Sequence, residues 1–107
     1  MMWTVETLGD LVDREIAAWP SDLRARLVKV AALIEAVGLE RLPHETIKHL
    51  EGKLWEIRLS AQSGISRAIY VTASGRRVVI VHAFIKKTQK TPLRTLELAR
   101  RRAKEVI

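Results

Sequence analysis

The chain has 107 residues, with 19 Lys and Arg against 12 Asp and Glu and a formal net charge of +7, a size and composition typical of one domain, residues 1–107, with a core of its own. It has no cysteine, which excludes disulfides and thiolate metal sites. It also shows neither an apolar run of the roughly 18 residues that a membrane span needs nor a secretory leader in its first residues, so we expect a cytoplasmic protein.

The first part of the chain predicts a short strand and two helices. Residues 3–7 fit a short strand. Apolar residues then recur at three- and four-residue spacing, first up to Pro20 and again from there to Gly38, which predicts two amphipathic helices. Because their connection is so short, we expect an antiparallel helix hairpin. Residues 42–49 read as a loop and a helix-like turn.

Three strands and a last helix follow. Apolar and polar residues alternate over residues 55–61, residues 66–72 form a second strand, and residues 78–85, apolar nearly throughout, form a third and central one. Short turns join them into an antiparallel meander. Pro92 suits the first turn of a closing helix. The sequence therefore predicts an α+β domain, in which the helices pack on one face of an antiparallel sheet of three strands, with a fourth strand at the N-terminus.

Strand alternation separates the two faces of this sheet. The helix-covered face is assigned its apolar set: Trp55, Ile57, Leu59, Val79, Val81, Ala83 and Ile85. The opposite face then carries the polar set and its neighbour: Glu56, Arg58, His82, Phe84 and Lys86. Arg67 belongs to the middle strand, whose mixed pattern leaves its direction open.

The opposite face predicts a site for phosphate. Residues 53–107 hold the excess of positive charge, whereas residues 1–52 are weakly acidic, and a clustered positive field attracts polyanions. Cations that are half-buried on a strand need a counter-charge, yet Glu56 is the sole acidic residue from 53 to 85. A ligand phosphate is the predicted partner, and a solvated basic surface is the alternative.

The histidines allow two interpretations. His82 is either a packed histidine or a proton-transfer group, since an unperturbed imidazole titrates at about pH 6.5. His44 and His49 lack the companion ligands that a metal site requires. We therefore predict neither a metal nor a cofactor.

Three segments resemble a known family. They are Lys53-Leu54-Trp55-Glu56-Ile57-Arg58, Arg67-Ala68-Ile69-Tyr70, and Val81-His82-Ala83-Phe84-Ile85-Lys86-Lys87-Thr88-Gln89-Lys90-Thr91-Pro92. They resemble the RelE/ParE superfamily of toxins, in its phage-derived HigB-like branch, and the likeness extends over residues 3–104. The resemblance implies a RelE-like fold and the toxin half of a type II toxin–antitoxin pair. Such a toxin is a ribosome-dependent endoribonuclease, or mRNA interferase, that inhibits translation, and its partner is an antitoxin of the helix-turn-helix type.

The resemblance also implies a reaction and a set of site residues. The reaction is attack of a ribose 2′-hydroxyl on the adjacent phosphate, without a metal. The predicted catalytic residues are Arg67, Lys86 and His82, and the predicted RNA-binding residues are Arg58, Lys87, Lys90 and Lys53. Several nucleases of this family use a tyrosine or histidine near the C-terminus, and this chain has neither after His82. The choice of general acid and base therefore stays open between Lys86 and His82.

Two other functions fit the same features. A ParE-like toxin inhibits gyrase without cutting RNA, and a nucleic-acid-binding module needs no catalysis; a shared fold does not decide between them. The Lys86-Lys87-Thr88 stretch favours the nuclease branch.

Overall fold

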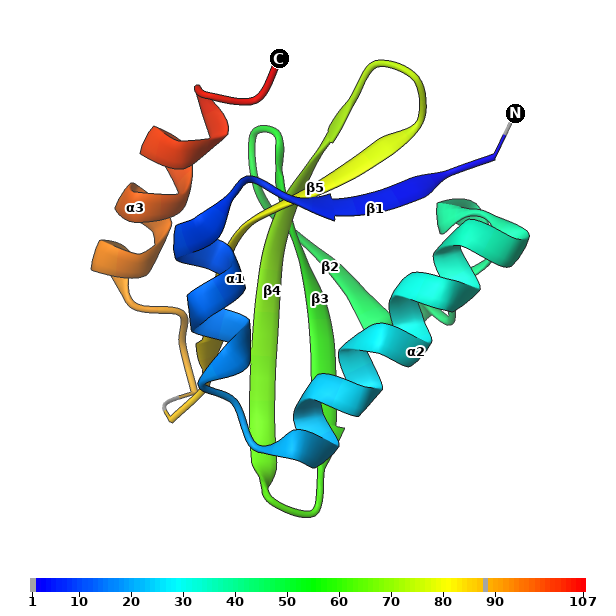
Figure 1. Cartoon of the computed structure of the whole chain (residues 1–107). Coiled ribbons are helices and arrows are strands. Elements are labelled where there is room, and N and C mark those ends of the chain that lie inside the picture. The colour runs from blue at the N-terminus through cyan, green and yellow to red at the C-terminus, as the bar shows by residue number, and fades with distance from the viewer. Residues whose placement is uncertain (1, 88) are drawn as a thin grey trace.

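One five-stranded sheet, in the order β1-β5-β4-β3-β2, separates two helical layers (Figure 1). The computed structural model describes residues 2–87 and 89–107, so Thr88 of the basic loop lies outside the described residues. No helix among the described residues is long and apolar enough to cross a membrane. The strands are β1 (Thr4–Thr7), β2 (Ile47–Glu51), β3 (Leu54–Ala61), β4 (Gly64–Ala73) and β5 (Arg77–Ile85); the helices are α1 (Asp10–Ala17), α2 (Ser21–Val37) and α3 (Leu93–Ala103), with short 3-10 helices η1 (Leu39–Arg41) and η2 (His44–Thr46).

The predicted α+β class is confirmed, and so are the three helices and the β3–β5 meander. α1 packs on β5, while α2 packs on β3 and β1, and the two helices run in opposite directions across the sheet and diverge (Figure 1). Gly38 ends α2 with a φ of 95°, a conformation that glycine adopts at little cost.

Two strands differ from the prediction. Residues 47–51 form the edge strand β2, antiparallel to β3, where the sequence predicted no strand and a loop with a helix-like turn over residues 42–49. β2 has five residues, and its charged and polar side chains hide the alternation that marks a strand. β1 pairs with β5 in parallel, so the sheet is mixed rather than antiparallel. A parallel pair requires a long connection between its strands. Here the chain between β1 and β5 contains α1, α2 and the strands β2, β3 and β4.

α3 packs on the face of the sheet opposite α1 and α2, which corrects the prediction that all helices share one face. The sheet therefore has two cores. The core under α1 and α2 is made of apolar residues from both layers: Val12, Leu23, Leu27, Ile34, Ile57, Leu59, Ala68, Tyr70, Val78, Ile80 and Ala83. The core under α3 contains Leu54, Ile69, Val71, Val79, Val81 and Ala99. β4 and β5 carry apolar side chains on both faces of the sheet. Each face therefore needs a layer of helices to cover it.

A β-bulge in β5 explains which predicted core residues changed face. Ile69 on β4 pairs with His82 and the next residue, Tyr70, pairs with Ile80, so Val81 is the extra residue. Before the bulge, Val79 lies under α3 together with Val81, not under α1 and α2 as predicted. Beyond the bulge, Ala83 and Ile85 lie on the predicted face.

Trp55 was also predicted as core. Its side chain is instead 38% exposed, and its ring lies 4.8 Å from that of His49 on the edge strand β2.

Candidate phosphate-binding site

Four cations and one carboxylate gather on the α3-facing side of the sheet. We call this group the cationic cluster: Lys48 on β2, Glu56 and Arg58 on β3, Arg67 on β4, and Lys86 directly after β5. Strand register places them there, since Lys48 pairs with Glu56 and Arg58 pairs with Arg67. Lys86 extends the sheet by one residue, because its backbone N–H donates to the Ile65 carbonyl at 2.8 Å. The register also settles the direction of Arg67, which shares a face with Arg58 as the predicted site requires.

Glu56 lies at the centre of the cluster and is almost fully buried. Its Oε2 is 3.6 Å from Nε of Arg67 and 3.9 Å from Nε of Arg58, which is within ion-pair range but beyond a hydrogen bond. Arg67 is 6% exposed, and its Nη1 donates to the Ser66 carbonyl at 2.9 Å. Among the described residues, neither Glu56 Oε1 nor Arg67 Nε has a hydrogen-bond partner. One carboxylate therefore serves several cations, and a buried donor stays unmatched.

The pKa shifts have the same origin. Burial lowers the pKa of the Arg67 guanidinium; Glu56 opposes this shift and the charge of Arg58 adds to it. Arginine nevertheless stays protonated at neutral pH. Burial also lowers the pKa of Lys86, and the charge of Arg67 lowers it further. An anion placed between Arg67 and Lys86 would stabilise their charged forms and raise both pKa values again.

A pocket of about 490 Å³ adjoins the cluster at the edge of β3. The last residue of β3 that pairs with β2 is Ile57, so the following stretch of that edge has no strand beside it. α2 and η2 border the gap instead, and Arg26 on α2 donates from Nε to the Ser60 carbonyl at 3.0 Å. The lining residues are Arg26, Lys29, Val30, Glu45, Thr46, Arg58, Leu59, Ser60, Ile65 and Arg67. Arg58 and Arg67 thus belong both to the pocket and to the cationic cluster.

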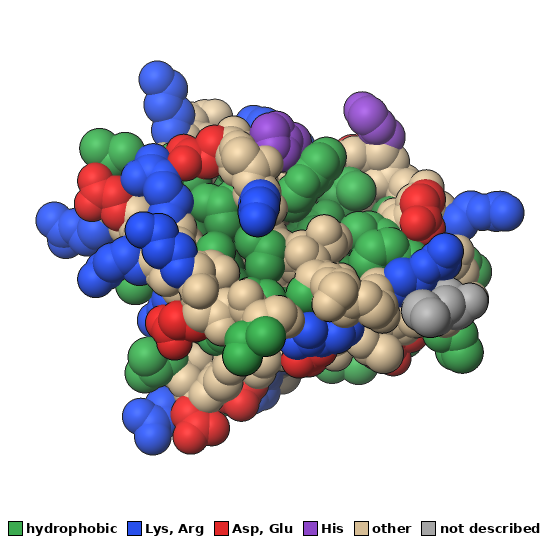
Figure 2. Space-filling view, turned by 90° about the horizontal axis from the view of Figure 1, so that it is seen from above, with side chains coloured by type: hydrophobic (Ala, Val, Ile, Leu, Met, Phe, Trp, Pro, Cys, Tyr) green, Lys and Arg blue, Asp and Glu red, His purple; other side chains and the backbone are tan. Residues whose placement is uncertain are grey.

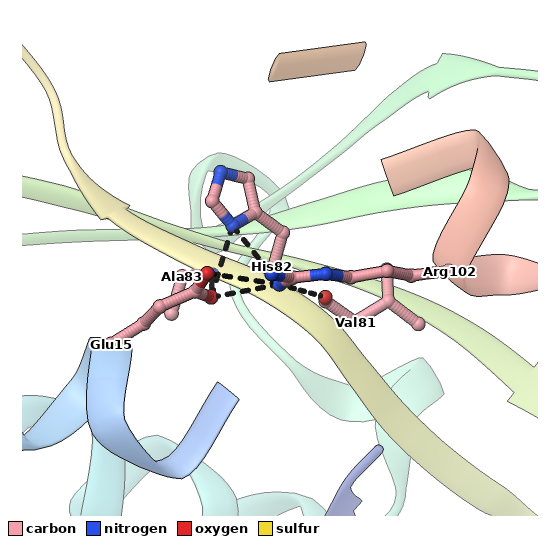
Figure 3. A network of polar contacts seen from close by, with 5 residues as sticks. All are labelled: Glu15, Val81, His82, Ala83 and Arg102. Carbon is pink, nitrogen blue, oxygen red and sulfur yellow. Dashed lines mark hydrogen bonds and ion pairs between the residues drawn. The ribbon is translucent and has the colours of Figure 1, made fainter. Parts of the chain in front are cut away.

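His82 takes part in a separate network that joins α1, β5 and α3 (Figure 3). Its Nδ1 lies 3.0 Å from Glu15 Oε1, and the Ala83 backbone N–H donates to the same oxygen at 3.0 Å. Arg102 donates from Nη1 to both Glu15 oxygens at 3.1 and 2.9 Å, and to the Val81 carbonyl at 2.9 Å. The His82 side chain is 12% exposed, and its second ring nitrogen points away from these partners (Figure 3).

The other predicted residues are spread out. Lys87 and Lys90 are exposed, Lys87 next to Lys86 and Lys90 in the loop before α3. Lys53 lies in the turn at the far end of β3, where it lines a second cavity with Arg100 and Lys104. The structure therefore brings Arg58, Arg67 and Lys86 together and does not bring Lys53 to them.

Sequence reasoning missed several neighbours of the site. Lys48 could have been placed beside Glu56 only if residues 47–51 had been read as a strand that pairs with β3. The other missed residues lie on elements that are far in sequence from the strands of the site. The network around His82 includes Glu15 and Arg102, and the pocket includes Arg26, Lys29 and Glu45. No local pattern signals these residues.

With this geometry in place, the comparisons with known proteins identify the family. Residues 14–104 match the phage-derived Gp49-like proteins. The chain belongs to this family. A comparison of the Gp49-like chain with curated proteins gives no match. Among solved structures it is similar to RelE in the archaeal RelE–RelB complex from Pyrococcus horikoshii OT3, with a TM-score of 0.57 and 19% identity over 79% of this chain and 96% of that chain. The expected RelE-like fold and phage-derived family are thereby confirmed.

Proposed function

We propose that this Gp49-like protein is the toxin of a type II toxin–antitoxin pair and acts as a ribosome-dependent mRNA endonuclease. The observation that carries the proposal is the buried, incompletely paired Arg67, with Arg58, Lys48 and Lys86 around a single carboxylate. The cationic cluster lacks hydrogen-bond acceptors and negative charge for its cations. Phosphate oxygens supply both, because guanidinium groups bind them with charge-assisted hydrogen bonds. The RelE-like fold supports a toxin rather than an unrelated RNA-binding module.

The cluster suits cleavage by the 2′-hydroxyl of the RNA itself. In this reaction the 2′ oxygen forms a bond to the adjacent phosphorus while its proton passes to a base. The bond from phosphorus to the 5′ oxygen breaks and that oxygen takes up a proton, which leaves a cyclic phosphate and a 5′-hydroxyl. Arg67 and Arg58 would stabilise the charge that develops on the phosphate oxygens.

We assign the transfer of the 2′ proton to Lys86. A lysine is a poor base at its ordinary pKa, and the burial and positive neighbours of Lys86 shift it toward its neutral form. His82 has its Nδ1 committed to the Glu15–Arg102 network, and we assign it to positioning β5 against α3.

The partner of the toxin would be an antitoxin, of the helix-turn-helix type, encoded in a neighbouring reading frame. A free nuclease of this kind would arrest its host, so the antitoxin has to block or distort the cationic cluster. The solved relative is likewise held in a complex, RelE with RelB.

The test is expression of the chain alone and together with its neighbour. Alone it should stop growth, and translating ribosomes should show mRNA cut at discrete positions; co-expression should restore growth. Arg67→Ala should be harmless, whereas Arg14→Ala, an exposed arginine on α1, should stay toxic. Harmless expression of soluble, folded wild-type protein would contradict the toxin assignment. Growth arrest without mRNA cleavage would contradict the nuclease and indicate a target such as gyrase.

A further inference from the structure

We propose that the pocket at the free edge of β3 binds a nucleobase, and that Glu45 makes it selective for guanine. The inference rests on the proposed function, because the phosphate of the same nucleotide would lie at Arg58 and Arg67. These two side chains form the wall that the pocket shares with the cationic cluster. A nucleotide can therefore place its phosphate on one side of this wall and its base on the other.

The pocket has the size and lining of a small-ligand site. Its volume of about 490 Å³ falls within the roughly 300–1,000 Å³ of such sites. Val30, Leu59 and Ile65 supply an apolar surface for a planar ring, and Arg26 and Lys29 on α2 lie across from β3. Unstacked RNA bases bind to proteins by stacking on aromatic rings or on guanidinium planes, and the arginines of this lining supply guanidinium groups.

Glu45 is the one acidic residue among the described lining residues, which include four basic ones. Nevertheless, no ion pair or hydrogen bond involves its carboxylate within the part of the chain that the structure describes. Its side chain is exposed, in the middle of η2 and two residues before β2 begins. The carboxylate is therefore available to a ligand.

A carboxylate distinguishes the four bases by its two acceptor oxygens. Guanine offers two adjacent donors on its Watson–Crick edge, the N1–H and the exocyclic amine, and pairs with both oxygens. Adenine and cytosine offer an exocyclic amine next to a ring acceptor, and uracil offers one N–H between two carbonyls. These three bases would each place an acceptor against the carboxylate, so guanine is the base that Glu45 selects.

The experiment is a titration of the wild-type protein with the four nucleoside 3′-monophosphates and with inorganic phosphate. Calorimetry measures the affinities, and amide NMR shows which residues each ligand affects. We expect 3′-GMP to bind about tenfold more tightly than the other three, as for one bidentate base contact. The NMR shifts should include the backbone amides of Thr46 and Ile65. Glu45→Gln should remove the preference and keep phosphate binding, whereas the matched change Glu40→Gln on η1, outside the pocket lining, should leave the preference intact.

Equal affinity for the four nucleotides would overturn the inference. So would a guanine preference that survives Glu45→Gln, or affinity for inorganic phosphate that no base improves. The titration requires neither ribosomes nor cleavage. A failure of the base pocket is therefore distinguishable from a failure of the proposed nuclease, which the growth and mRNA assays test.

Discussion

At Arg67 the fold holds a guanidinium where little water reaches it. The side chain is nearly buried, its nearest carboxylate oxygen is 3.6 Å from Nε, and Arg58 lies directly opposite on β3. Like charges opposite each other on neighbouring strands destabilise a sheet, and an incompletely paired buried charge is costly. A position that is unfavourable for folding in this way is typical of a binding or catalytic group.

The first prediction concerns this arginine. Arg67→Ala should reduce ribosome-dependent cleavage by about 10²–10³-fold, the usual effect of removing one group that stabilises transition-state charge. Arg67→Lys should restore little, because an ammonium lacks the planar fork that matches two phosphate oxygens. Single-turnover cleavage of mRNA on ribosomes measures both. Circular dichroism should show that each variant folds, and an Arg67→Ala variant of wild-type activity would place the reaction elsewhere.

The second prediction concerns pH and Lys86. Because the pKa of Lys86 is lowered, its neutral fraction increases as pH rises and is complete above that lowered value. The cleavage rate should therefore rise with pH, about tenfold per unit while the lysine is mostly charged, and level off below the ordinary lysine value of about 10.4.

The control for this pH profile is a pair of variants. Lys86→Ala should lose cleavage, and His82→Gln should keep both the activity and the profile. A wild-type rate that is already level at about pH 7 would instead indicate an imidazole base.

At the scale of elements, side chains replace a missing strand beside β5. β1 ends at Thr7, which pairs with Ile80, so the rest of β5 has an open edge on that side. Glu15 accepts the Ala83 N–H and Arg102 donates to the Val81 carbonyl, as a neighbouring strand would do. Since Glu15 belongs to α1 and Arg102 to α3, the same contacts link the layers on the two faces (Figure 3).

The third prediction tests this link. Arg102→Ala should lower the free energy of unfolding by about 1–3 kcal/mol, because it removes the cation that pairs with the partly buried Glu15 carboxylate and takes the Arg102 donor away from Glu15 Oε2 and from the Val81 carbonyl. Urea denaturation measures the loss, and hydrogen exchange should become faster in α3. Arg101→Ala, at the exposed neighbouring position, should change the stability by no more than about 0.5 kcal/mol. Equal effects of the two substitutions would show that the network contributes nothing specific.

Elements with strong periodicity could be predicted from the sequence, and elements defined by their neighbours could not. α1, α2 and β3–β5 follow from the spacing of apolar residues, and the period of two placed Arg58, His82 and Lys86 on one face. β2 was missed because it is short and polar. The bulge at Val81, the parallel pairing of β1 and the side that α3 covers depend on contacts between distant segments.

The candidate site divides in the same way. Arg58 and Lys86 could be placed by alternation, and Arg67 by its position in the middle strand once the register was known. The base pocket could not be placed, since Arg26, Lys29 and Glu45 reach it from α2 and η2. Their approach depends on β2 leaving the edge of β3 open.

At the scale of the whole molecule, the charge is spread widely as well as clustered. Seen from the end that carries both termini, Lys and Arg side chains project most densely on the side of α3 and a few project on the opposite side, with Asp and Glu among them (Figure 2). With a net charge of +7, such a surface favours polyanions at long range; under the proposed function, the cationic cluster would then fix where a phosphate of the RNA binds.

The fourth prediction separates these two contributions. RNA affinity should fall with salt, with a slope of about −0.7 for each phosphate neutralised on a single strand. Arg58→Ala should make this slope shallower by about 0.7, the amount that corresponds to one phosphate. Lys87→Ala or Lys90→Ala should change the slope less. Arg14→Ala on α1 should leave it unchanged. Filter binding of a short RNA over a range of salt concentrations gives the slopes, and an affinity independent of salt would mean that the basic half only confers solubility.

The bulge at Val81 also makes the cationic cluster depend on the number of residues between Ile80 and Lys86. Moving a strand by one residue sends every following side chain to the other face of the sheet, and Lys86 lies only five positions beyond Val81. Removing one codon between Ile80 and Lys86 would therefore turn Lys86 away from Arg67 unless the pairing of β5 slips to compensate. Apolar substitutions at Val81, by contrast, leave the count of residues intact. Relatives that diverge freely in sequence along β5 should therefore still keep the spacing between Ile80 and Lys86.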